Sequence, residues 1–180
     1  MSWLFHRKTR RLATALGALG LVATLAGCST NRATGEDSFT AFMSPDQEKQ
    51  VGAEEHPKIV REFGGDYDEK NIEAYVTEIG NKLVAVSEAP DEKFTFTVLD
   101  SPVINAFALP GGYVYITRGL ASLASNEAEL AGVLAHEIGH VVARHSAQRY
   151  SRGVLTQILA GGLSAALGNG AGDIVGVGAN

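Results

Sequence analysis

The chain has 180 residues, of which 45% are hydrophobic and 19% are charged, proportions that are ordinary for a globular protein with a buried core and that argue against wholesale disorder. Four of its 15 basic residues precede Cys28, so the rest of the chain carries 11 basic residues against 20 acidic ones, a formal charge of −9. Such an acidic body gives no electrostatic footprint for phosphate backbones, and nucleic acid is not expected as a partner.

Residues 1–27 have the pattern of a signal peptide. A basic cluster at residues 7–11 is followed by an apolar run over residues 12–26, which is too short to span a bilayer stably. The run ends at Leu-Ala-Gly-Cys28, which resembles a bacterial lipobox, where the cysteine is diacylated and becomes the new amino terminus. We expect lipidation of Cys28 to anchor the protein to a membrane, the alternative being a plain secretory signal with a chance cysteine.

Residues 28–43 are polar and are expected to form a lipidated tether without fixed structure. Ser29 follows the cysteine in place of the aspartate that resembles an inner-membrane retention signal, which favours the outer membrane. The predicted location is therefore the bacterial cell envelope, with the domain of residues 44–180 facing the periplasm.

Two helices are predicted next. Ser44-Pro45-Asp46-Gln47 has a capping serine, proline at the first helical position and glutamine three residues after the cap, so a helix should run over residues 44–63 and end at Gly64-Gly65. A second helix, capped by Asp68 and ending before Pro90, has apolar residues at three- and four-residue spacings, the pattern of one buried stripe.

Three strands and a long helix follow. Alternating residues 94–99 predict a half-buried strand, and residues 103–109 and 113–117 predict two strands joined by a tight turn at Pro110-Gly111-Gly112. Asn126 caps a helix that should reach about Gln148. This order predicts an α+β fold with helices packed on a small, mainly antiparallel sheet.

The chemistry lies in the last of these helices. His136 and His140 are four residues apart, so at about 100° per residue both imidazoles lie on one helical face and can reach one ion. Zinc suits two neutral imidazoles with an oxygen ligand and an open position. Glu137 lies at the edge of that face, where it can accept a proton from an attacking water. A chance His-Glu-x-x-His string is the alternative, but these residues are the polar exceptions on an otherwise apolar helix.

The segments Asn105–Leu120 and Asn126–Ser146 together resemble the central block of peptidase family M48, the gluzincin metalloproteases, in its periplasmic lipoprotein branch. The resemblance implies a zincin-like (minigluzincin) domain in which His136 and His140 bind Zn²⁺ and Glu137 is the general base. It also implies that an edge strand above the metal pairs with substrate, the strand formed by Tyr113, Val114, Tyr115 and Ile116. Unfolded or misassembled envelope proteins would be the substrates.

The chain departs from that family after Glu137. A gluzincin takes its third ligand as a glutamate from a later helix, and no glutamate follows Glu137 here. Asp173 is a poor substitute, and His145 should point about 180° away from His136 on the same helix, where a structural hydrogen bond is the expected role. Residues 44–180 are therefore interpreted as a metallopeptidase domain incomplete at its carboxyl end, with an inactive peptide-binding chaperone or adaptor lipoprotein as the alternative.

Overall fold

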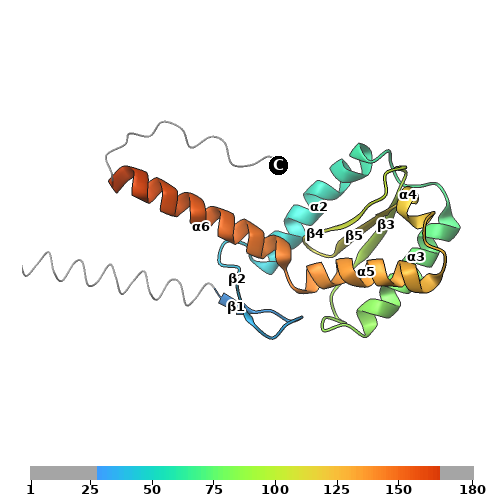
Figure 1. The fold of residues 1–180 in the computed structure, drawn as a ribbon, viewed down its shortest axis with the longest axis horizontal. Coiled ribbons are helices and arrows are strands. Elements are labelled where there is room, and N and C mark those ends of the chain that lie inside the picture. The colour runs from blue at the N-terminus through green and yellow to red at the C-terminus, as the bar shows by residue number, and fades with distance from the viewer. Residues whose placement is uncertain (1–27, 167–180) are drawn as a thin grey trace, which may run out of the picture.

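The computed structural model describes residues 28–166, and the predicted signal peptide lies outside them. A three-stranded sheet with strand order β3-β5-β4 occupies the middle of the domain (Figure 1). It consists of β3 (Thr95–Leu99), β4 (Ala106–Leu109) and β5 (Tyr113–Thr117). β3 and β5 run parallel, whereas β4 and β5 form the predicted antiparallel pair. The α+β prediction is confirmed.

Helices cover both faces of this sheet. The helices are α2 (Pro45–Glu62), α3 (Lys70–Ala85), the short α4 (Arg118–Ala121), α5 (Glu127–Val142) and α6 (His145–Ala166). α3 and α5 pack together on one face, where their apolar stripes meet Phe96, Val98, Val114 and Ile116 in the core. On the other face, His56 of α2 stacks on Tyr113 and Tyr115.

Local signals set the start of α2 but not that of α3. Ser44 forms the complete capping box with Gln47. α2 ends just before Gly64 and Gly65, as predicted, and both glycines have positive φ angles that are incompatible with a continuing helix. α3 begins later than expected: Glu69 is its N-cap and makes no side-chain capping bond, so the predicted Asp68 cap is wrong. The buried stripe of α3 holds the helix in place without it.

The predicted tether is a folded hairpin. β1 (Cys28–Thr30) pairs antiparallel with β2 (Asp37–Phe39), and Ser38 Oγ donates to the Ser29 carbonyl at 3.1 Å. The segment is fixed to distant helices, because the Phe42 amide donates to Ser151 Oγ at 3.1 Å. Polar composition predicted a loose segment here, whereas hydrogen bonds to partners over a hundred residues away order it.

α6 leaves the body of the domain and projects from it (Figure 1). The glycine-rich stretch that begins at Gly153 is helical as far as Ala166, and its Ile158 and Leu159 are exposed. Within residues 28–166, no helix combines the length and the apolar composition that crossing a membrane requires.

The close contact between α2 and the β4–β5 turn can be tested by replacing Gly52 with alanine, which adds one methyl group. A Cβ at Gly52 would overlap the Pro110 carbonyl and lie 2.8 Å from the Tyr113 ring. Gly52→Ala should therefore lower the free energy of unfolding by about 1–3 kcal/mol in urea denaturation. Gly132→Ala in α5 is the matched control: its Cβ meets open space, so it should raise stability by up to about 1 kcal/mol. Equal effects of the two substitutions would contradict this packing.

Candidate metal centre

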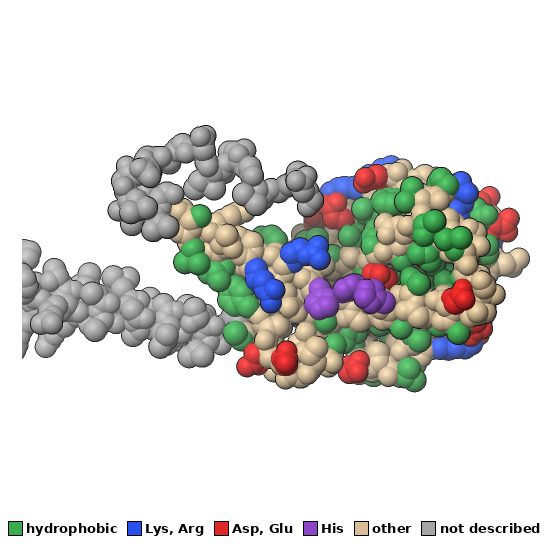
Figure 2. Space-filling model, viewed as in Figure 1, with side chains coloured by type: hydrophobic (Ala, Val, Ile, Leu, Met, Phe, Trp, Pro, Cys, Tyr) green, Lys and Arg blue, Asp and Glu red, His purple; other side chains and the backbone are tan. Residues whose placement is uncertain are grey.

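α5 has an apolar face and a polar face. Leu130, Leu134 and Ile138 are buried in the core, whereas His136 is exposed and His140 is half-buried. The two imidazole rings lie 4.5 Å apart between centroids and nearly perpendicular, at 77°. Histidine side chains form one continuous patch on this face of the molecule (Figure 2). The predicted juxtaposition of His136 and His140 is therefore present.

Glu137 lies at the boundary between the two faces of α5. Only 8% of the residue is exposed, although His136 beside it is open to solvent. On the open face, a Cβ at Gly139 would meet nothing within 4 Å, so the helix surface beside the histidines is unobstructed. Glu137 is thus largely withdrawn from bulk water, although it is adjacent in the chain to the exposed His136.

The predicted long helix is wrong at its carboxyl end. α5 stops at Val142, Arg144 adopts a left-handed φ of 54°, and α6 starts at His145. A left-handed residue that is not glycine costs about 1–2 kcal/mol, so other contacts must compensate. The break turns His145 back toward the site: its Nδ1 lies 2.5 Å from His140 Nδ1. The expectation that His145 points away from the histidine pair is therefore also wrong, whereas the predicted hydrogen bond is present.

The surroundings of His145 disfavour its charged form. Desolvation is the largest cause that lowers its pKa, followed by the neighbouring His140 and by the positive charges of Arg149 and Arg152. Lys and Arg side chains border the histidine patch in Figure 2. These surroundings shift the pKa of His145 below its ordinary value and so favour the neutral ring.

The two histidines of α5 suit a zinc ion by chemistry and by proximity. Neutral imidazoles four residues apart on one helix are common zinc ligands, and the open face leaves room for further ligands. Among residues 28–166, no group of three or more histidine, cysteine or acidic side chains has the arrangement of a metal site. Asp173, considered above as a third ligand, lies outside the described residues.

The predicted substrate strand is misplaced. β5 is the central strand, paired with β3 on one side and β4 on the other, so it has no free edge. Val114 and Ile116 point into the core, and Tyr115 is fully buried under α2 with its hydroxyl 2.8 Å from His56 Nδ1. Pairing with a peptide at Tyr113–Ile116 would require β5 to give up an existing partner.

β4 is the edge strand beside α5. Residues Ala106–Leu109 are half-buried and pack against α5, and within residues 28–166 they pair with no strand other than β5. A cavity of about 230 Å³ has Ala108 and Leu109 of this strand in its wall together with His140. The sequence contained β4 as a strand, but strand order depends on tertiary packing, so nothing in the sequence marked β4 as the edge.

Comparison with known proteins agrees with this geometry. The model of peptidase family M48 matches residues 70–177, which is more than half of the chain. The mitochondrial metalloendopeptidase OMA1 of Schizosaccharomyces pombe is 36% identical over 111 residues, which are 59% of this chain and 32% of that protein. The beta-barrel assembly-enhancing protease of Escherichia coli K12 is 33% identical over 114 residues, 62% of this chain and 23% of that protein.

A third relative is the putative beta-barrel assembly-enhancing protease of Vibrio cholerae, 44% identical over 77 residues, 43% of this chain and 16% of that protein. The chain thus spans a third or less of the length of these relatives. A helix with a histidine pair and a buried glutamate, packed beside a small sheet, defines the class of zincin-like metallopeptidase domains. Within that class, the chain belongs to peptidase family M48.

Replacement of either His136 or His140 should reduce zinc binding. His136→Asn and His140→Asn each remove an imidazole and put in its place an amide, which is a poor zinc ligand, so bound zinc measured by atomic absorption after dialysis should fall well below that of the unmodified protein. His56→Asn is the control, because His56 lies on α2 on the opposite side of the sheet. Equal zinc content in all three variants would show that the metal binds elsewhere.

Proposed function

We propose that this protein is a zinc-dependent endopeptidase of the bacterial cell envelope that hydrolyses unfolded or misassembled proteins. The observation that carries the proposal is the pair of neighbouring imidazoles of His136 and His140 on α5, with the largely buried Glu137 next to His136 in the same helix. Membership of family M48 supports the same reaction.

The histidine pair and the glutamate have different roles in this proposal. His136 and His140 hold the zinc ion, which when bound supplies Lewis acidity to polarise the scissile carbonyl. Glu137 accepts the proton of the attacking water and later delivers it to the leaving amine. Its withdrawal from bulk water strengthens its interaction with nearby charge.

The substrate is proposed to extend β4 as an added strand. In the part of the chain that the structure describes, β4 has a free edge next to α5, and its Ala108 and Leu109 share a cavity with His140. A peptide paired along this edge would therefore pass beside the proposed metal ligands. Main-chain pairing recognises an extended backbone more than a particular sequence. This suits chains that have failed to fold, and it favours quality control as the biological role.

Anchoring at Cys28 would hold this site close to the membrane. Cys28 is the first residue of β1 and is exposed, and the hairpin that follows is fixed to the domain through Phe42 and Ser151. A diacylated Cys28 would therefore place the domain directly on the outer-membrane surface. Because the body is acidic, attraction to anionic lipids would contribute little, and hydrocarbon chains would supply the affinity.

The proton acceptor can be tested by Glu137→Gln in the full-length protein. Loss of one general base costs about 10²–10⁴-fold in rate, so casein cleavage should fall by at least that range while bound zinc is retained. Glu88→Gln, at an exposed position after α3, is the control and should cleave casein at the original rate. Undiminished cleavage by Glu137→Gln would refute the proposal, and peptide binding without any cleavage in the unmodified protein would favour the chaperone or adaptor function.

Lipidation can be tested by Cys28→Ser in the native cells. The wild-type protein should be found in the membrane fraction, with an intact mass that includes acyl groups. The Cys28→Ser variant should be found in the soluble fraction, because it has no hydrocarbon anchor. This anchor would be excluded if the serine variant still associated with the membrane and the mass of the wild-type protein included no acyl groups.

A further inference from the structure

The contact between His140 and His145 is a hydrogen bond and not shared ligation of one ion. Two nitrogens bound to the same tetrahedral zinc, at about 2.0–2.1 Å each, lie about 3.3 Å apart. The Nδ1 atoms of His140 and His145 are only 2.5 Å apart, and the rings meet edge to face with centroids separated by 4.8 Å. One nitrogen must therefore donate a proton to the other.

From this contact we infer that His145 is a positioning residue for His140, an inference that rests on the proposed zinc site. With Nδ1 of His140 directed at His145, its Nε2 is the nitrogen left for the metal. A metal-binding imidazole carries its proton on the other nitrogen, so His140 Nδ1–H donates and His145 Nδ1 accepts. Such a partner fixes the tautomer and the ring orientation of the ligand before the ion arrives.

The left-handed turn at Arg144 is what brings His145 into range. In a continuous helix, five residues rotate a side chain by about 500°, which would put His145 about 140° from His140 around the axis. The φ of 54° at Arg144 interrupts that rotation, and α6 starts at His145 in a new direction.

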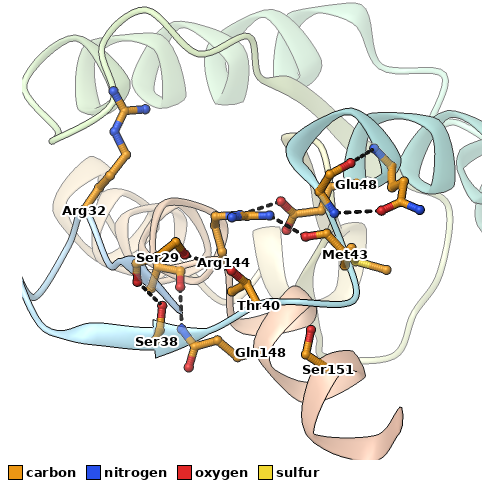
Figure 3. Close-up of polar contacts among 12 residues, drawn as sticks. Ser29, Arg32, Ser38, Thr40, Met43, Glu48, Arg144, Gln148 and Ser151 are labelled. Atoms are coloured by element: carbon orange, nitrogen blue, oxygen red, sulfur yellow. Dashed lines mark hydrogen bonds and ion pairs between the residues drawn. The ribbon is translucent and has the colours of Figure 1, made fainter. Parts of the chain in front are cut away.

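The turn is clamped by the amino-terminal half of the chain. Arg144 Nε donates to Glu48 Oε2 at 2.6 Å, and a terminal nitrogen of its guanidinium donates to the Met43 carbonyl at 2.8 Å. Figure 3 shows Arg144 extended between these two partners. Both side chains of the ion pair are largely buried, with 22% of Arg144 and 10% of Glu48 exposed, so water competes little for the contact.

A second set of hydrogen bonds fixes the residue before the turn. The Ala143 carbonyl accepts from Asn31 Nδ2 at 3.4 Å and from Gln148 Nε2 at 2.7 Å. Asn31 belongs to the loop of the β1–β2 hairpin, so the segment next to the predicted lipid anchor contributes to the geometry of His145. Three segments thus fix the position of His145 and, through it, the orientation of His140: the hairpin, the start of α2 and the α5–α6 turn.

The test compares two replacements of His145 in the full-length protein, with zinc affinity measured by competition against a chromogenic chelator. His145→Ala removes the acceptor and should weaken zinc binding by about 10- to 100-fold. His145→Asn places an amide oxygen near the position of Nδ1 and should bind zinc almost as tightly as the unmodified protein. The visible absorption bands of the Co²⁺-loaded protein should be unchanged in His145→Asn, because the ligand set stays the same.

The outcomes separate positioning from the other possible roles. Equal loss of affinity in both variants, with altered Co²⁺ bands, would make His145 a ligand and overturn the inference. Undiminished affinity in His145→Ala would also overturn it. Thermal unfolding of the metal-free variants detects a merely structural role, which would lower the melting temperature without a selective loss of zinc.

Arg144→Ala extends the test to the clamp. It leaves all three histidines in place but removes the contacts that hold the turn, so zinc affinity should fall toward that of His145→Ala. Retained affinity in Arg144→Ala would show that the turn does not depend on this clamp. Since none of these readouts requires cleavage, failure of the positioning role is distinguishable from failure of the proposed peptidase activity, which Glu137→Gln tests.

Discussion

The buried stripe of α5 determines where every other part of the site can lie. Leu130, Leu134, Ile138 and Val142 pack into the core beside α3 and the sheet, and this leaves one rotation of the helix possible. In that rotation His136 faces solvent and Glu137 lies at the boundary of the core. Burial of four large apolar side chains contributes several kcal/mol in total, far more than any single polar contact, so packing and not the histidines sets the helix orientation.

The end of α5 illustrates a local conformation imposed by distant residues. Ala143 and Arg144 are both good helix formers, and nothing in their side chains favours a left-handed turn. The turn persists because the Arg144 guanidinium reaches a buried carboxylate and a backbone carbonyl from a segment a hundred residues earlier. Burial, which outweighs the neighbouring Arg144 charge, raises the pKa of Glu48, so part of the attraction is spent on desolvation.

Other long-range contacts give the amino-terminal segment a fixed structure. Residues 28–43 have a polar composition typical of a linker, yet they form a hairpin whose loop and flanks bond to α6 and to the α5–α6 turn. A membrane anchor at Cys28 would then be joined rigidly to the domain, which would fix both the distance and the orientation of the site relative to the lipid. Composition alone does not distinguish these cases, because polar side chains can bond to protein as readily as to water.

Residue spacing and local chemistry were sufficient to predict the Ser44 capping box, the Pro110–Gly112 turn and the placement of His136 and His140 on one face of α5. Periodicity fixes such features because neighbours along a helix or strand are neighbours in space. Tertiary structure alone decided that β5 is central and β4 is the edge, and that His145 bonds to His140 across a helix break. Strand order and the break depend on contacts between segments far apart in the chain, and no local pattern encodes which of those contacts gives the lowest free energy.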